Sequence, residues 1–353
     1  MADPGLPEAV AHSVADHVVD DLNRLTGSEP ITWSVDVSRD TMPLTHQNEI
    51  LLWEHAPDLR RDRGWDYVIY LTDLPRSIDN NSLVCSLDTP SRSALISLPA
   101  LGAVRTTSKT RKMLTELIRS LQQEVPDQSS GVAGTRNLNR GGWRRIPRDD
   151  SNGSYDLVLT GPFNRPRLLA GMVRNNRPLR VLPALSGSTA TAVATGAFGI
   201  FYTSIWNMAD AASTSRMAMI SISVVLAFTI WLVFHNGLWT RTRGASHDMR
   251  SWRDNAATFI TLGIGVALMY VVLWAILFTV SMAVINQEYL ASNLGHAVNL
   301  LDYLNISWLA SALGMMAGAV GSNFDSESNI REATYTRREN VRRQLAETED
   351  VDG

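Results

Sequence analysis

The chain has 353 residues, enough for more than one domain, and its formal net charge of −3 gives it no basic character, which argues against nucleic-acid binding. Its single cysteine, Cys85, excludes an internal disulfide and a zinc site built on several cysteines. The composition, 45% hydrophobic and 19% charged, is that of an ordinary soluble protein. This average hides a division, because the long apolar runs are concentrated between residues 185 and 323. The sequence therefore predicts an α/β cytosolic domain plus an all-α transmembrane domain of four helices.

Residues 1–125 have the patterns of a small α/β domain. Apolar residues recur at helical spacing over residues 8–25, and "ITWSVDV" (31–37) alternates apolar and polar residues like a strand with one exposed face. "DYVIYLT" (66–72) is almost continuously apolar, which is typical of a central strand. The other expected elements are a helix over residues 47–61 that is interrupted near Pro57, a hairpin of strands 83–89 and 94–100, and a helix over residues 107–123. The N-terminus lacks the basic start and apolar core of a signal peptide, so we expect this domain in the cytosol.

One acidic residue of this domain, Asp73, has a position suited to a ligand crevice. It follows the expected central strand, and the ends of strands in α/β sheets commonly border ligand sites. The alternative is that the Asp73 side chain caps a turn before Pro75. The sequence leaves both interpretations open.

No motif commits the domain to catalysis. "AVRTTSKT" (103–110) lies between a strand and a helix, as a phosphate loop does, but Ala103 and Ser108 occupy the positions where such a loop needs glycine. The order of strands, helix and hairpin is similar to a zincin core, yet the final helix reads "MLTELIRSL" and lacks the HExxH of a zinc protease. We therefore expect no catalytic residue, no cofactor and no bound metal.

Two segments connect this domain to the apolar half. Residues 126–160 are rich in Gly, Ser and Arg, which predicts a linker. Residues 161–184 mix arginines with apolar residues, and we expect them to lie along the inner membrane surface with the arginines against anionic lipid headgroups. The arginines of this segment are Arg165, Arg167, Arg174, Arg177 and Arg180. The alternative is a basic linker that only follows the topology rule for membrane proteins.

The apolar half, residues 185–324, contains four segments that can cross a membrane, each of which needs about 20 predominantly apolar residues. Residues 217–234, 257–285 and 306–324 contain no charged residue. Residues 189–208 are the fourth segment, although they are rich in Gly, Ala and Thr. The charged residues 325–353 are expected to form a cytosolic tail.

The distribution of arginines supports four crossings. With four spans, the segment before the first span, the loop between the second and third, and the tail are rich in Arg, whereas the two opposite loops together contain one Arg. Basic loops stay on the cytosolic side, so both termini are expected in the cytosol and the protein in the inner (plasma) membrane. The spans contain no Asp, Glu, Lys or Arg, which argues against a proton- or ion-coupled pump.

Small residues recur at helical spacing in the first and fourth spans. The first span has Ser188, Ala192 and Gly196 at every fourth position, and the fourth has a GxxxG formed by Gly314 and Gly318. Such faces let helix backbones approach closely in lipid, and we expect them to mediate association into a homo-oligomer or larger complex. General tolerance of small residues in membrane helices is the alternative.

Four stretches carry a resemblance to a known family. They are "WDYVIYLTDLP", "ALISLPALGAV", "RPRLLAGMVRNNRP" and the C-terminal "YLNISWLASALGMMAGAVGSNFDSESNIREATYTRR". The chain resembles an uncharacterised family of actinobacterial four-span integral membrane proteins over most of its length. The resemblance implies a soluble N-terminal domain and a four-span C-terminal half, without established catalytic residues. Some corynebacterial relatives carry a methylene-tetrahydrofolate dehydrogenase label, but no glycine-rich dinucleotide turn follows a cytosolic strand in this sequence.

Three functions are compatible with these patterns. The first is a non-enzymatic membrane protein whose cytosolic domain binds a partner or ligand and is coupled to a membrane assembly. The second is a passive channel or transporter with a cytosolic gate, which polar residues along a continuous pore would favour. The third is a membrane-tethered enzyme with a degenerate zincin-like domain, which a deep cytosolic pocket with converging ionisable groups would favour.

Overall fold

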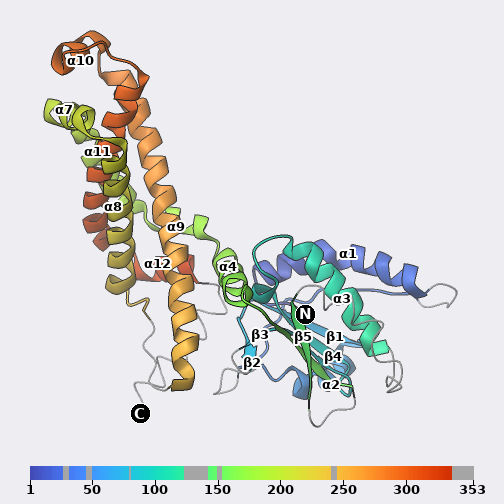
Figure 1. Ribbon diagram of the computed structural model, residues 1–353. Helices are drawn as coiled ribbons and strands as arrows, with labels where there is room; N and C mark the ends of the chain where they lie inside the picture. Colours follow the sequence, from blue (N-terminus) through green and yellow to red (C-terminus); the bar gives the residue numbers. More distant parts are fainter. Residues whose placement is uncertain are drawn as a thin grey trace. The chain divides into compact units, whose positions relative to one another are not determined.

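The computed structural model describes residues 1–26, 32–44, 50–78, 81–122, 142–148, 153–239 and 245–335. Within these residues the chain forms two compact units, which divide between Asn175 and Asn176 (Figure 1). The first unit is a mixed α/β sheet region and the second is helical. The predicted division into a sheet-containing region followed by long apolar helices is thus confirmed.

The described strands of the first unit form one six-stranded mixed sheet with the order β1-β4-β3-β6-β5, and β2 pairs with β3. The strands are β1 (Val68–Thr72), β2 (Ser77–Ile78), β3 (Asn81–Asp88), β4 (Ser93–Ser97), β5 (Trp143–Pro147) and β6 (Tyr155–Leu159). Only the β1–β4 pair among them is parallel. The antiparallel β3–β4 pair is the hairpin that the sequence predicts.

Strand β1 lies at one end of the strand order, not in the middle as its apolar run predicts. Residues 1–3 run along its free side: the Leu71 amide donates to the Met1 carbonyl, and the Asp3 amide donates to the Leu71 carbonyl, each over 3.0 Å. The Asp3 carboxylate also accepts a hydrogen bond from the Thr72 hydroxyl over 2.6 Å. These contacts cover the edge of β1 and explain why an edge strand is buried.

The expected strand at residues 31–37 is not present in the described part, residues 32–37. This segment is extended, but the strand edge that could pair with it is already occupied, because Ala2 bridges both Leu71 and Arg39. The alternation of apolar and polar residues therefore reflects an extended segment that covers a cavity and not a strand of the sheet.

The expected linker over residues 126–160 is wrong in its second part, which contains β5 and β6. Strand β6 pairs with both β3 and β5, and all five of its residues are buried. A short strand buried on both faces has no alternation to reveal it, and here it is preceded by Gly- and Ser-rich sequence. The earlier part of the expected linker, residues 126–141, lies outside the described residues.

The sheet unit has four α-helices and one 3-10 helix among its described residues. They are α1 (Leu6–Thr26), α2 (Leu52–Arg63), η1 (Leu98–Leu101), α3 (Thr106–Gln122) and α4 (Asn164–Asn176), of which the last residue falls in the second unit. Helices α1 and α3 lie close to the predicted bounds, whereas α2 begins at Leu52, after undescribed residues 45–49. The interruption expected near Pro57 is wrong, because α2 continues through this residue.

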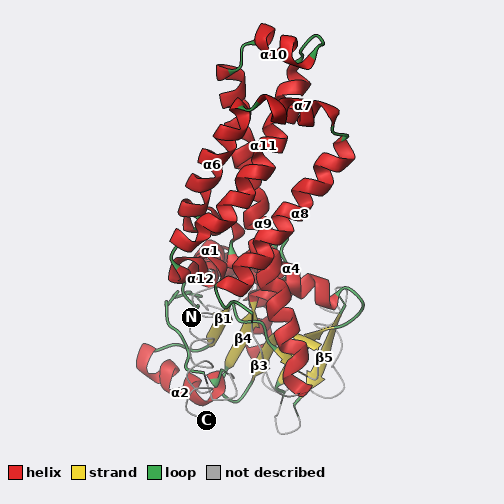
Figure 2. Cartoon of the chain, turned by 90° about the vertical axis from the view of Figure 1, so that its left-hand side faces the viewer, coloured by secondary structure: helices red, strands yellow, loops and turns green. Residues whose placement is uncertain are grey.

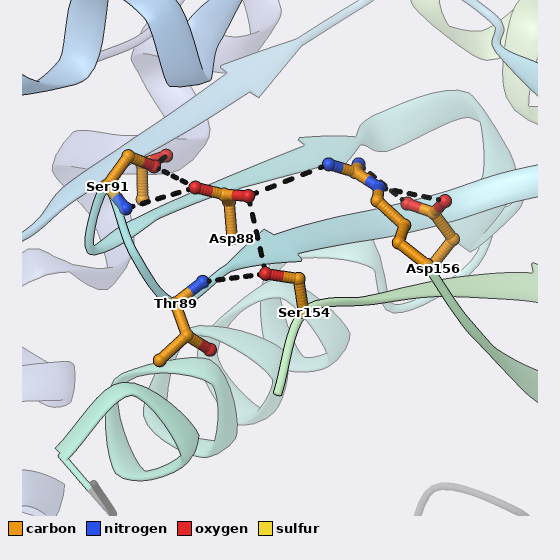
Figure 3. A network of polar contacts seen from close by, with 7 residues as sticks. Asp88, Thr89, Ser91, Ser154 and Asp156 are labelled. Atoms are coloured by element: carbon orange, nitrogen blue, oxygen red, sulfur yellow. Dashed lines mark hydrogen bonds and ion pairs between the residues drawn. The ribbon is translucent and has the colours of Figure 1, made fainter. Parts of the chain in front are cut away.

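A polar network holds the turn between β3 and β4 against the start of β6 (Figure 3). Asp88 accepts hydrogen bonds from the Ser91 amide over 3.0 Å and from the Ser154 hydroxyl over 3.3 Å. Arg148 donates twice to Asp156, over 2.9 and 3.2 Å, and its guanidinium also lies 3.8 Å from Asp88. The network thus places one guanidinium between two largely buried carboxylates.

The described part of the second unit consists of helices only (Figure 2). They are η3 (Pro178–Arg180), α5 (Val181–Ala184), α6 (Ser186–Phe201), α7 (Thr203–Ala211), α8 (Thr214–His235), α9 (Ala245–Val284), α10 (Gln287–Leu294), α11 (Leu300–Gly321), η4 (Ser322–Phe324) and α12 (Glu327–Thr334).

Three described helices are long and apolar enough to cross a membrane: α8, residues Ser251–Val284 of α9, and α11. The expected span at residues 189–208 is interrupted at Tyr202, where α6 ends and α7 begins. Helix α6 has 16 residues, about 24 Å of helix at about 1.5 Å per residue, which is shorter than a hydrocarbon core of about 30 Å. It qualifies as a span only together with the bent helical segment before it, so the unit has three to four candidate spans.

The beginning of the expected tail belongs to the helical unit. Ile330, Ala333 and Tyr335 are buried in its apolar core, and the Tyr335 hydroxyl donates to the Leu238 carbonyl over 3.0 Å. Only Ile330 and Ala333 have helical spacing, and two apolar residues are too short a signal to stand out in a charged segment. Residues 336–353 lie outside the described residues.

Candidate ligand-binding cavity

A cavity of about 360 Å³ lies within the sheet unit, between α1, the extended residues 32–37, strand β1 and α3. Residues 32–37, which do not join the sheet, contribute all six of their residues to the lining of the cavity. Ligand pockets in proteins are of this size, about 300–1,000 Å³.

The two helices supply an apolar wall. Val14, Val18 and Leu22 recur at every fourth position of α1, and Leu114 and Ile118 have the same spacing on α3. This spacing places each set on one face of its helix, so the two faces meet across the cavity. The sequence periodicity predicts the faces correctly but does not predict that they enclose a cavity.

Aromatic side chains also line the cavity. The rings of Trp33 and Tyr67 are stacked, with centroids 6.1 Å apart, and Trp65 lies nearby in the lining. The Trp33 indole N–H is buried and has no hydrogen-bond partner among the described residues.

The charged groups of the lining are mainly acidic. Asp36 and Asp66 are exposed residues of this lining, which contains no Lys or Arg. The Met1 amine is buried beside it and donates to the Ile69 carbonyl over 3.0 Å. Burial lowers the pKa of this amine to about 6, although Asp36 and Asp40 oppose the change. Near neutral pH the amine is then mostly uncharged. The carboxylates of Asp36 and Asp66 therefore make the cavity favourable for a cation.

Asp73, which the sequence suggests as part of a ligand crevice, does not line this cavity. It follows the last residue of β1 and is only 4% exposed. The residues that do line the cavity, Trp33, Trp65 and Tyr67 among them, were not predicted as a site. The signal available for them is an aromatic residue close to an aspartate in both "TWSVD" and "GWDY".

The five arginines expected at a membrane surface differ in their exposure to solvent. Arg165 and Arg180 are exposed, whereas Arg174 and Arg177 are half-buried. Arg167 packs into the sheet unit, with its guanidinium 5.5 Å from the centre of the Trp143 ring, and burial lowers its pKa. Helix α4 itself lies against η1, because a Cβ atom on Gly171 would be 2.0 Å from the Pro99 carbonyl oxygen. Arg167 is therefore engaged within the sheet unit, contrary to the expectation from its basic surroundings.

The small residues of α6 and α11 face each other within one chain. A Cβ atom on Gly314 would be 2.5 Å from the Ala192 carbonyl oxygen and 3.3 Å from the Gly196 Cα. A Cβ atom on Gly318 would be 3.0 Å from the Ser188 carbonyl oxygen. These five residues thus pack two helices of the same chain together, so they do not provide a surface for association between chains.

In comparisons with known proteins, no family model, no curated protein and no solved structure matches this chain.

Proposed function

We propose that this chain is an integral membrane protein whose α/β unit binds a small molecule in the cavity between α1 and α3. The observation that carries the proposal is the cavity itself, which has apolar and aromatic walls and two carboxylates in its lining. Its volume is more than twice the ~150 Å³ that accommodates benzene in an apolar protein core. The preferred ligand has an apolar or aromatic body and a positively charged group.

The membrane arrangement that we propose has four crossings, the fourth being α6 with the segments that flank it. Both termini and the α/β unit then lie in the cytosol, and the protein lies in the inner (plasma) membrane. The distribution of arginines along the sequence supports this topology. Exposed Arg165 and Arg180 are the arginines that we assign to anionic lipids. We also propose that the chain belongs to the actinobacterial four-span family, on the basis of the four stretches that resemble it.

Polar groups within the helical unit favour a packed anchor over a passive pore. The Trp308 indole N–H donates to the Ser221 hydroxyl over 2.6 Å, and this hydroxyl lies 2.9 Å from the Tyr270 hydroxyl. The Tyr270 hydroxyl also donates to the Trp308 carbonyl over 3.1 Å. Groups that are paired with each other in this way stabilise helix contacts in lipid and do not need water.

The ligand proposal can be tested with a pair of matched substitutions on α1. Ala15→Trp introduces a large side chain at the cavity wall, whereas Asp16→Trp introduces the same side chain at an exposed position outside the lining. The probes are benzyltrimethylammonium and, as the anionic counterpart, benzenesulfonate. Binding to the full chain in detergent is measured by calorimetry.

We expect the parent protein and Asp16→Trp to bind the cation, and to bind it about tenfold more tightly than the anion, because an attraction of about 1.4 kcal/mol is a factor of ten. Ala15→Trp should lose this binding. Equal binding by the two tryptophan variants, or no preference for the cation in the parent protein, would show that the cavity is not the site.

A further inference from the structure

Three potential metal ligands meet at the end of the helical unit where α7 and α10 lie (Figure 2). Asp210 is near the C-terminal end of α7, His296 is in the connection between α10 and α11, and Asp302 is in the first turn of α11. One ligand atom from each residue lies within 4.8 Å of the other two. The distance along the sequence between Asp210 and the other two residues explains why sequence analysis does not find this group.

The imidazole of His296 is placed between two oxygen atoms. Its Nδ1 lies 3.1 Å from the Ala297 carbonyl oxygen, and its Nε2 lies 3.1 Å from Oδ1 of Asp210. A neutral imidazole has one N–H group and can donate only one of these two hydrogen bonds. Both contacts are favourable together when a cation is present, either a second proton on the ring or a metal ion at the nitrogen lone pair.

The carboxylate of Asp302 makes a proton alone a poor match. This residue is 9% exposed, and its Oδ2 accepts a hydrogen bond from the Asn299 amide over 2.7 Å, which fixes its orientation. This bond uses one oxygen and leaves the other for a cation. A protonated imidazole offers one positive charge to two carboxylates, whereas a divalent ion neutralises both.

We propose that Asp210, His296 and Asp302 bind one divalent transition-metal ion, for which Zn²⁺ is the test ion. Two ligands about 2.1 Å from an ion are about 3.0 Å apart at right angles and about 3.4 Å apart at the tetrahedral angle that Zn²⁺ prefers, and the distance of 3.1 Å between Asp210 and His296 lies between these values. The Nδ1–H group of His296 then donates to the Ala297 carbonyl, as the second nitrogen of a metal-binding histidine usually does. The bound ion would join the end of α7 to the start of α11.

The experiment uses the full chain, purified in detergent with an affinity tag that contains no histidine, stripped with EDTA and dialysed. Zn²⁺ binding is measured by calorimetry and by metal analysis, and Co²⁺ is added as a spectroscopic substitute. We expect one equivalent of Zn²⁺ and a Co²⁺ visible spectrum with bands from bound nitrogen and oxygen ligands. Asp210→Asn and His296→Gln should each weaken Zn²⁺ binding by roughly tenfold or more.

The control is His12→Gln, which removes an exposed histidine on α1 that belongs to no such group and should leave Zn²⁺ binding unchanged. Thermal unfolding in EDTA shows whether each variant is folded. If His296→Gln is unfolded, Asp210→Asn alone decides the test, because Asp210 is an exposed residue. Binding by His296→Gln and Asp210→Asn as tight as that of the parent protein would overturn the proposal. A parent protein that binds no Zn²⁺ would do the same and would assign a proton to the contact.

Discussion

Asp325 caps the N-terminus of α6, although 138 positions separate it from Gly187. Its two carboxylate oxygens accept hydrogen bonds from the backbone amides of Gly187, over 2.6 Å, and Ser188, over 3.0 Å. The Ser188 hydroxyl donates to the same carboxylate over 2.7 Å. The first amides of a helix have no partner within the helix and carry partial positive charge, so a carboxylate is a favourable partner for them. The contact joins the segment after α11 to the start of α6.

Loss of this cap should destabilise the helical unit. We expect Asp325→Ala to lower the free energy of unfolding by about 0.5–2 kcal/mol, the usual range for removal of a helix cap. Thermal unfolding of the full chain in detergent is the measurement. The neighbouring Ser326→Ala serves as the control, since the Ser326 hydroxyl contacts only the exposed Ser328 hydroxyl among the contacts described. A shift in Ser326→Ala equal to that in Asp325→Ala would contradict a capping role.

A methyl group at Gly314 should separate α6 from α11. In an exposed helix, Gly→Ala is stabilising by about 1 kcal/mol, but here the added Cβ would lie 2.5 Å from the Ala192 carbonyl oxygen. Gly314→Ala should therefore lower the thermal stability of the protein in detergent. Gly263→Ala in α9 is the matched control, because its nearest contacts are ordinary ones, 3.9 Å away on Thr229. If the two variants have the same stability, the close approach of α6 and α11 is wrong.

Replacement of Arg148 should leave two carboxylates facing each other in the sheet unit. Asp88 and Asp156 have side chains only 15% and 9% exposed, so their charges are poorly solvated. We expect Arg148→Gln to cost about 3 kcal/mol of stability in chemical unfolding followed by circular dichroism. Arg61→Gln, which breaks an exposed ion pair with Asp58, should change the stability by at most about 1 kcal/mol. Similar losses in the two variants would show that burial of the pair has no effect.

The thiol of Cys85 should be unreactive in the folded protein. This side chain is buried in β3, and burial raises the pKa of the thiol, with a further contribution from Asp156. Only the thiolate reacts with disulfide and alkylating reagents, so we expect no reaction with Ellman's reagent near neutral pH and one equivalent after denaturation. Reaction of the folded protein at the rate of a free thiol would place Cys85 at the surface.

The sequence predicts those elements whose periodicity reports a buried face. Helices α1 and α3 and the β3–β4 hairpin are found near their expected positions because each has a clear pattern of apolar residues. Strand β6 is missed because it is buried on both faces and pairs with residues more than 65 positions earlier. The extended residues 32–37 mimic a strand because the residues that occupy the edge of β1 come from the start of the chain.

The cavity and the metal-ligand group depend on tertiary contacts that no local pattern contains. Trp33 and Tyr67 are 34 positions apart in the chain and are in ring contact, and Asp210 and His296 are 86 positions apart and are 3.1 Å from each other. The small residues of α6 and α11 are conspicuous in the sequence, but the sequence does not tell whether their partner is in the same chain. A contact within one chain and a contact between chains require the same spacing of small residues.

The number of membrane crossings tests the account most directly, because an even number places the α/β unit and the C-terminus on the same side. The chain offers a clean labelling background, since its one cysteine is buried. Asp16→Cys, Ser292→Cys and Gly353→Cys are each treated with a membrane-impermeant maleimide in intact and in permeabilised cells. With four crossings, Asp16→Cys and Gly353→Cys are labelled only after permeabilisation, whereas Ser292→Cys is labelled in intact cells. Labelling of Asp16→Cys and Gly353→Cys from opposite sides would mean that α6 does not contribute a crossing and would contradict the account.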